Sequence, residues 1–186
     1  MSTSLTRPVR LALAAAASAA ALLVAAPGAS AGPCAGAGAS PGVAPSSVVS
    51  GATLCLLNLE RASHGLRRVR LNRKLSKAAR RHAEDMVRHR YFAHDSRSGA
   101  DFVSRIRRAG YLRKARYWTV GENLAWGDGN RATPASIVDA WMNSPEHRAN
   151  ILDPAFRDIG VWIAPGAPES YQAPAGTYAT EFGARR

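Results

Sequence analysis

The chain has 186 residues, and its 25 lysines and arginines against 13 aspartates and glutamates give a formal net charge of +12. The length indicates one folded domain. The charge favours acidic partners such as an anionic cell-wall polymer, a glycan or lipid headgroups. Nucleic acid is a less favoured partner, because no sequence signature of a nucleic-acid-binding fold accompanies the charge.

Residues 1–31 have the composition of a secretory signal peptide. A short basic region is followed by an apolar stretch over residues 11–26 and a small-residue cleavage site at Ala29-Ser30-Ala31. The apolar stretch is too short and too rich in alanine for a membrane span, and no later segment reaches the necessary length. We therefore expect a secreted, extracellular or cell-wall-associated protein. A lipoprotein modified at Cys34 is the less favoured alternative, because Gly32-Pro33 is a poor match to the residues that precede such a cysteine.

The chain contains two cysteines, Cys34 and Cys55, and both follow the predicted cleavage site. An even number of cysteines in an exported chain indicates a disulfide. The bond would join a flexible leader of Gly, Ala, Pro and Ser (residues 32–47) to the first helix, and it would stabilise the fold by roughly 3 kcal/mol. The alternative is a buried free thiol at Cys55 and an unpaired Cys34.

Helical periodicity begins at Val48, and Gly65 is expected to end this first helix. Asn72 is a suitable N-cap for a second helix. That helix has an apolar stripe at helical spacing, formed by Leu75, Ala79, Ala83 and Met86. A shorter third helix is predicted over residues 100–109. The first half of the domain is therefore predicted to be helical.

The middle of the chain begins with a β-branched and aromatic stretch at residues 117–120, which predicts a strand. Residues 127–130 have the composition of a loop. Thr133-Pro134 then opens a helix, since a threonine cap and a proline in the first turn are typical of helix starts. Pro145 ends that helix and starts a further single turn.

The end of the chain alternates between apolar and polar residues over 159–164 and 177–182, which predicts two strands joined by a loop rich in Pro and Gly. Helices that come first and strands that come last indicate an α+β layered fold.

Three motifs carry the residue types that chemistry requires: YFAH ending at His94, GENLAW containing Glu122, and WMNSPEHRANIL containing His147. Two imidazoles and a carboxylate form either a divalent-metal site or an acid/base site where they meet in space. The spacing of the motifs does not show that they meet.

These motifs, together with a following IGV and an opening helix LCLLNLERASHGL, resemble the CAP superfamily (cysteine-rich secretory proteins, antigen 5 and pathogenesis-related proteins; SCP-like), in its secreted bacterial branch. The resemblance lies within a domain that we place at residues 48–186. It implies an α-β-α sandwich with a small antiparallel sheet between helical layers. It also implies that His94, Glu122 and His147 line a shared cavity.

Each cavity residue has a structural alternative. His94 could be a helix C-terminal histidine that responds only to the helix dipole, and Glu122 could be a hydrogen-bonding hub, since a buried carboxylate needs partners. Animal and plant members of the family usually carry a second glutamate where this chain has Ser144. Glu146 is a candidate substitute, although an acidic residue in a first helical turn is common.

These residues favour a non-enzymatic, monomeric binding protein whose His94/Glu122/His147 cavity holds a divalent metal, zinc above all. One alternative is a metal-dependent hydrolase of peptides, esters or phosphodiesters, with Glu122 as third ligand or general base. The other is an exported nuclease or polyanion binder that uses the arginine clusters. A further set on the second helix, His82, Asp85 and His89, is interpreted as a half-buried helix face.

Overall fold

The computed structural model describes residues 34–186. The predicted signal peptide and the first two residues of the leader lie outside the described residues. Within residues 34–186, no helix has the length and apolar character needed to cross a membrane.

Helices occupy most of the first part of the described chain, and two long strands end it. In chain order the elements are α1 (Ser46–Ser63), β1 (Arg70–Leu71), α2 (Arg73–His89), α3 (Phe102–Arg108), β2 (Trp118–Asp128), η1 (Gly129–Ala132), α4 (Pro134–Met142), α5 (Pro145–Leu152), β3 (Asp158–Pro165) and β4 (Ala175–Arg185). The predicted α+β class is confirmed.

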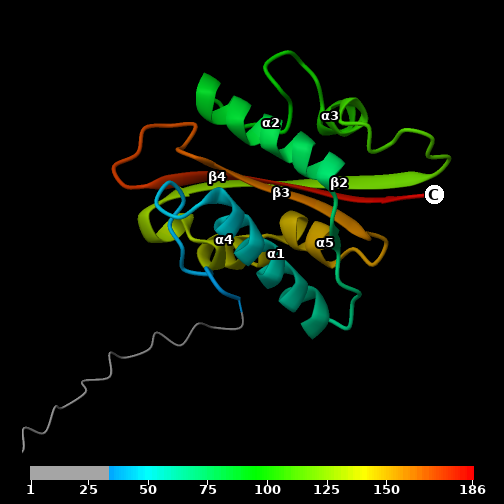
Figure 1. Ribbon diagram of the computed structural model, residues 1–186, viewed down its shortest axis with the longest axis horizontal. Helices are drawn as coiled ribbons and strands as arrows, with labels where there is room; N and C mark the ends of the chain where they lie inside the picture. Colours follow the sequence, from blue (N-terminus) through cyan, green and yellow to red (C-terminus); the bar gives the residue numbers. More distant parts are fainter. Residues whose placement is uncertain (1–33) are drawn as a thin grey trace, which may run out of the picture. The chain divides into compact units, whose positions relative to one another are not determined.

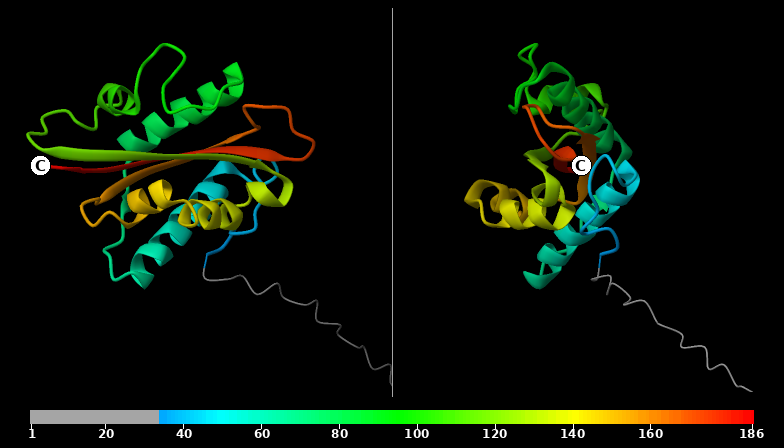
Figure 2. Two further views of the ribbon diagram at one scale, coloured as in Figure 1. Left: turned by 180° about the vertical axis from the view of Figure 1, so that it is seen from behind. Right: turned by 90° about the vertical axis from the view of Figure 1, so that its left-hand side faces the viewer.

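The strands form one sheet in the order β1-β3-β4-β2. Helices α2 and α3 lie on one face of the sheet, and α1, α4 and α5 lie on the other (Figure 1; Figure 2). The predicted α-β-α sandwich is therefore confirmed, with one correction. The sheet is mixed rather than purely antiparallel, because the short strand β1 pairs parallel to β3.

Helix α2 packs very closely on the sheet. Asn72 caps it as predicted, accepting a hydrogen bond from the backbone N–H of Lys74, and the predicted apolar stripe is buried. Gly160 on β3 makes the approach possible, since a Cβ at this position would lie only 2.1 Å from the carbonyl carbon of Leu75. This contact fixes α2 above the centre of the sheet.

The predicted disulfide joins Cys34 to Cys55 of α1, with the two Cα atoms 5.7 Å apart. The leader differs from its prediction over the described residues. Cys34 is buried, and the carbonyl of Ala37 accepts a hydrogen bond from the N–H of Ala135 at the start of α4. Helix α1 begins at Ser46 rather than Val48. The disulfide therefore anchors a segment that contacts the domain.

Two other boundaries were wrong. Strand β2 does not stop at Val120 but continues to Asp128, through the GENLAW motif and into the predicted loop, because all 11 of its residues pair with β4. Helix α5 extends over 8 residues rather than one turn. The first correction matters for function, since it places Glu122 in the middle of an edge strand.

Candidate functional site

Glu122 lies on β2 directly opposite Glu181 of β4, which in turn lies opposite Gly160 of β3. Residues in register across a sheet share a face, and Gly160 contacts α2. Both glutamates therefore lie on the face that α2 and α3 cover. Both are also buried, with exposures of 4% for Glu122 and 0% for Glu181.

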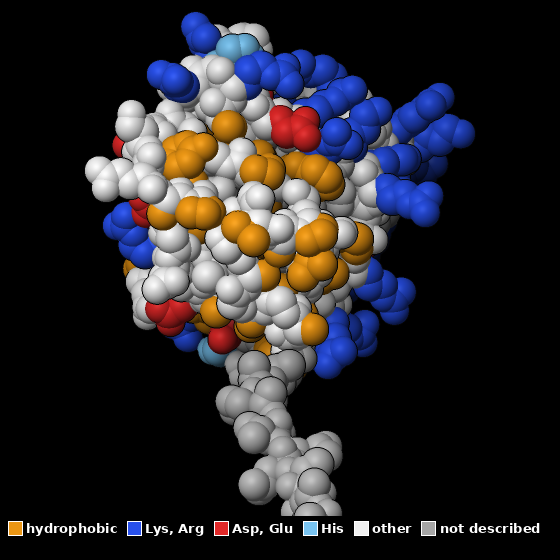
Figure 3. All heavy atoms as spheres, turned by 60° about the vertical axis from the view of Figure 1, so that its left-hand side comes forward, with side chains coloured by type: hydrophobic (Ala, Val, Ile, Leu, Met, Phe, Trp, Pro, Cys, Tyr) orange, Lys and Arg blue, Asp and Glu red, His pale blue; other side chains and the backbone are white. Residues whose placement is uncertain are grey.

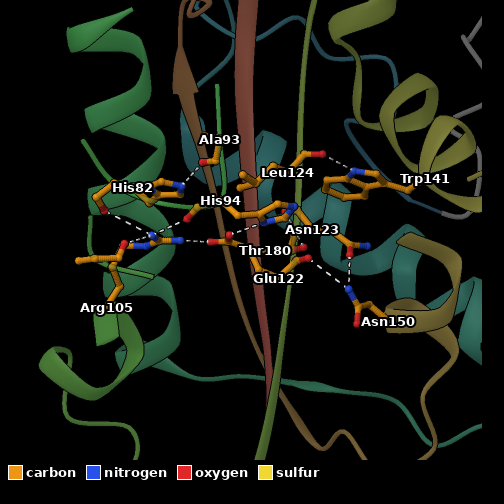
Figure 4. Close-up of polar contacts among 12 residues, drawn as sticks. His82, Ala93, His94, Arg105, Glu122, Asn123, Leu124, Trp141, Asn150 and Thr180 are labelled. Atoms are coloured by element: carbon orange, nitrogen blue, oxygen red, sulfur yellow. Dashed lines mark hydrogen bonds and ion pairs between the residues drawn. The ribbon is translucent and has the colours of Figure 1, made fainter. Parts of the chain in front are cut away.

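Arg105 of α3 is the principal partner of Glu122. Its Nη2 donates to Glu122 Oε2 at 2.5 Å, and its Nη1 donates to the carbonyl oxygen of His94 at 2.6 Å. The arginine side chain is only 7% exposed. One guanidinium therefore neutralises the buried carboxylate and also fixes the backbone at His94 (Figure 4).

His94 makes the second contact with Glu122, as its Nδ1 lies 2.7 Å from Oε1. The residue follows the left-handed C-cap of α2 at Arg90, and it interacts with this carboxylate rather than only with a helix dipole. The hydrogen bond to Glu122 raises the pKa of His94 above the ordinary value, against an opposing effect of burial. Its side chain is 56% exposed, so the imidazole can exchange protons with solvent.

The two glutamates have opposite ionisation. Burial raises the pKa of Glu122, but the hydrogen bond from His94 and the charge of Arg105 outweigh it, and the pKa lies below the ordinary value. Burial and the neighbouring Glu122 carboxylate raise the pKa of Glu181 well above that value. These opposite shifts favour Glu122 as the ionised carboxylate and Glu181 as the carboxyl group that holds a proton.

His147 lies on α5, a helix that packs on the opposite face of the sheet (Figure 1). Its Nδ1 lies 2.8 Å from Ser144 Oγ, and its carbonyl accepts a hydrogen bond from Asn123 Nδ2. Burial lowers the pKa of His147, and the charge of His94 lowers it further. Asn150 completes this connection, since its Nδ2 donates to the Glu122 carbonyl and to Asn123 Oδ1. The WMNSPEHRANIL motif is thus joined to the GENLAW motif by hydrogen bonds that involve amide side chains and backbone carbonyls.

Among the three predicted cavity residues, Glu122 and His94 are in direct contact. The Nδ1 atom of His147 bonds Ser144, and its ring lies near enough to His94 to feel the charge of that imidazole. Glu146 is exposed, and its role as a substitute for the missing glutamate stays a prediction. A buried second carboxylate beside Glu122 comes from Glu181 of β4. Sequence reasoning missed both Glu181 and Arg105.

The donor set gives poor support for a metal. Among residues 34–186, no group of three or more His, Cys, Asp or Glu side chains is arranged to hold a metal ion. Both oxygens of Glu122 already bind other side chains, one of them the cation of Arg105. Zinc binding by His94, Glu122 and His147 stays a prediction.

His82, Asp85 and His89 of α2 do not form one shared site. His82 is buried, and its Nε2 donates to the carbonyl of Ala93 at 2.9 Å. Asp85 instead pairs with His89 at 2.9 Å and accepts a hydrogen bond from Tyr91. His82 therefore supports the YFAH turn that carries His94.

Comparison with known proteins identifies relatives of the same fold. The model of the cysteine-rich secretory protein family (CAP) matches residues 54–180. YkwD of Bacillus subtilis is 40% identical over 120 residues, which is 63% of this chain and 44% of YkwD. YlbC, a membrane protein of the same organism, is 28% identical over 110 residues, or 59% of this chain and 30% of YlbC. The chain thus spans less than half the length of these curated relatives.

Two solved structures are similar. An extracellular protein containing an SCP domain from Bacillus anthracis has a TM-score of 0.59 at 25% identity, over 74% of this chain and 40% of that chain. An outer surface protein of Borrelia burgdorferi has a TM-score of 0.58 at 20% identity, over 72% of this chain and 90% of its own. At this identity the second comparison shows the fold alone.

Proposed function

The chain belongs to the cysteine-rich secretory protein (CAP) family, and from that premise we propose that it is an exported, non-enzymatic binding protein of the cell envelope. Its ligand is an anionic polymer, held on an arginine-rich surface. Export is supported by the signal-peptide composition and by the extracellular description of the similar protein from Bacillus anthracis. The arginine-rich surface is the reason for choosing an anionic polymer as the ligand.

The observation behind this choice is a set of three hollows lined by basic residues near the end of β4, which we call the basic groove. Neighbouring hollows share lining arginines: Arg185 and Arg186 line two of them, and Arg157 lines one of these and the third. The remaining cationic lining residues are Arg67, Arg68, Arg70, Lys74, Arg113 and Lys114. Figure 3 shows Lys and Arg side chains crowded along one side of the molecule. Such a surface attracts polyanions over long range.

Acidic residues hardly reduce the charge of this groove. Its lining contains one acidic side chain, Asp158, whose Oδ2 already accepts a hydrogen bond from the Tyr111 hydroxyl at 2.8 Å. Tyr117 and Trp118 line the same groove and are 76% and 43% exposed. Exposed aromatic rings beside arginines can stack on sugar rings while the guanidinium groups bind acidic substituents. A charged glycan polymer therefore fits better than a simple lipid headgroup.

The test compares retention of the protein on an anionic wall polymer and on a neutral matrix. Arg113→Gln with Arg186→Gln removes two charges from the groove, and Arg88→Gln with Arg97→Gln removes two exposed charges that lie outside its lining. We expect retention only on the polymer, falling with added salt, and a larger loss for the groove variant. Equal retention on both matrices, or equal loss in both variants, would reject the proposal.

The metal-dependent hydrolase is the weaker alternative. It needs an available carboxylate, but both Glu122 oxygens bind His94 and Arg105. A zinc titration by calorimetry tests the metal cavity on which this alternative depends. The absence of one-to-one binding would reject the predicted zinc site and the hydrolase with it. Binding that is lost in both His94→Ala and His147→Ala would restore the metal cavity and justify a search for hydrolytic activity.

A further inference from the structure

A pocket of about 200 Å³ lies outside the basic groove, between α2, the loop near Ser96 and α3. Its cationic lining comes from Arg81 on α2 and from Arg105 and Arg108 on α3. Arg81 and Arg108 are exposed, and neither forms an ion pair within the described part of the chain. Two guanidinium groups are therefore free to bind a ligand.

Arg105 adds an unsatisfied donor to this pocket. Its Nη1 atom donates to the His94 carbonyl, Ser96 and Ala100, and its Nη2 atom donates to Glu122. Its Nε is buried and has no hydrogen-bond partner within residues 34–186. A buried N–H without a partner is costly, and an anion that reached this atom from the pocket would supply the missing acceptor.

His82 lines the same pocket and adds an unsatisfied acceptor. Its Nε2 must carry the hydrogen, because it contacts the carbonyl oxygen of Ala93. The neutral ring therefore has a lone pair on Nδ1, and this buried atom has no partner among the described residues. Burial also lowers the pKa of His82, which favours the neutral ring. The side chain is 1% exposed.

The acidic lining residue does not oppose an anion strongly. Asp85 Oδ1 lies 2.9 Å from His89 Nδ1, and its Oδ2 accepts a hydrogen bond from the Tyr91 hydroxyl at 2.5 Å. Both oxygens are therefore engaged away from Arg81 and Arg108. The lining thus combines free cationic donors with one neutral acceptor (Figure 4 shows His82 and Arg105).

We propose that this pocket binds a phosphate group that retains a P–OH. The charged oxygens accept hydrogen bonds from Arg81, Arg105 and Arg108, and the P–OH donates to Nδ1 of His82. Arginine is well suited to phosphate because its planar fork makes charge-assisted hydrogen bonds. Sulfate has the same shape but carries no proton at neutral pH, so it would leave His82 without a donor. The pocket is separate from the basic groove, and phosphate binding there is a second activity beside polymer binding.

The test is calorimetry with inorganic phosphate at pH 7 and constant ionic strength in chloride. Arg81→Gln with Arg108→Gln removes the two free pocket cations. Arg88→Gln with Arg107→Gln removes one exposed arginine from each of the same helices, outside the pocket lining. We expect one-to-one binding, weakened about tenfold or more in the pocket variant and by less than about twofold in the control.

Competing anions complete the experiment. Sulfate should bind at least about tenfold more weakly than phosphate, because one hydrogen bond at His82 is lost. Displacement of phosphate by glycerol phosphate at pH 6 would identify a terminal phosphate monoester as the ligand, whereas no displacement would identify the free ion. Equal binding of sulfate and phosphate, equal loss in both variants, or no saturable binding would overturn the proposal.

Discussion

Glu181 should make the protein less stable as the pH rises. Its pKa is raised well above the ordinary value by complete burial and by the neighbouring Glu122 carboxylate, whereas in the unfolded chain it returns to about 4.3. Between these two values the folded protein holds one more proton than the unfolded chain. Linkage then lowers the free energy of unfolding as the pH rises through this window, by about 1.4 kcal/mol per pH unit.

Glu181→Gln keeps the shape of the side chain and cannot ionise, so it should remove this dependence. Unfolding in urea at pH 5, 6 and 7, followed by tryptophan fluorescence, gives the free energy of each protein. We expect wild type to lose about 1.4 kcal/mol relative to Glu181→Gln between pH 5 and 6. Glu146→Gln is the control, because Glu146 is exposed, and it should follow wild type. Identical pH dependence of Glu181→Gln and wild type would refute the assignment of the proton.

Three further predictions concern the same structure. Glu122→Gln should lower the free energy of unfolding, measured in urea, by about 3–5 kcal/mol, because it leaves the buried Arg105 without a counter-charge. A loss below about 1 kcal/mol would contradict that ion pair. Imidazole NMR titration should place the pKa of His94 above the ordinary value of 6.5 and that of His147 below it. The stabilisation from His94 is then full in acid and is lost as the pH rises through its folded pKa. The reverse order of titration would be inconsistent with the His94–Glu122 contact. Cys55→Ser should lower stability by about 2–4 kcal/mol, and an unchanged urea midpoint would mean that the disulfide does not stabilise the fold.

Elements with strong local signals could be predicted from the sequence. The Asn72 cap and the apolar stripe of α2 were predicted correctly, as was the start of α4, where Thr133 accepts a hydrogen bond from the N–H of Ser136. Strand β2 was predicted too short, because glycine and asparagine near residues 127–130 suggest a loop. Pairing with β4 overrides that composition, and such long-range pairing has no local signal.

The site could be predicted only in part, for a similar reason. Glu122 and His94 were recognised from their motifs, and they are in contact. Arg105 is one of three arginines in the last turn of α3, and the other two, Arg107 and Arg108, are exposed. A cluster of arginines predicts exposed positions for all three side chains. Glu181 gave a usable signal, because an acidic residue inside an apolar alternating strand must be neutralised or paired.

The means of neutralisation determine what chemistry remains around Glu122 and Glu181. A buried carboxylate can be balanced by a proton, a cationic side chain or a metal ion. Here Glu181 takes the proton and Glu122 takes Arg105, so the two carboxyl groups require no further cation. The group left in contact with both solvent and the carboxylate is His94, whose ring can exchange a proton. Binding of larger charged partners is therefore left to the unpaired arginines of the surface, which supports the envelope-binding proposal over the hydrolytic one.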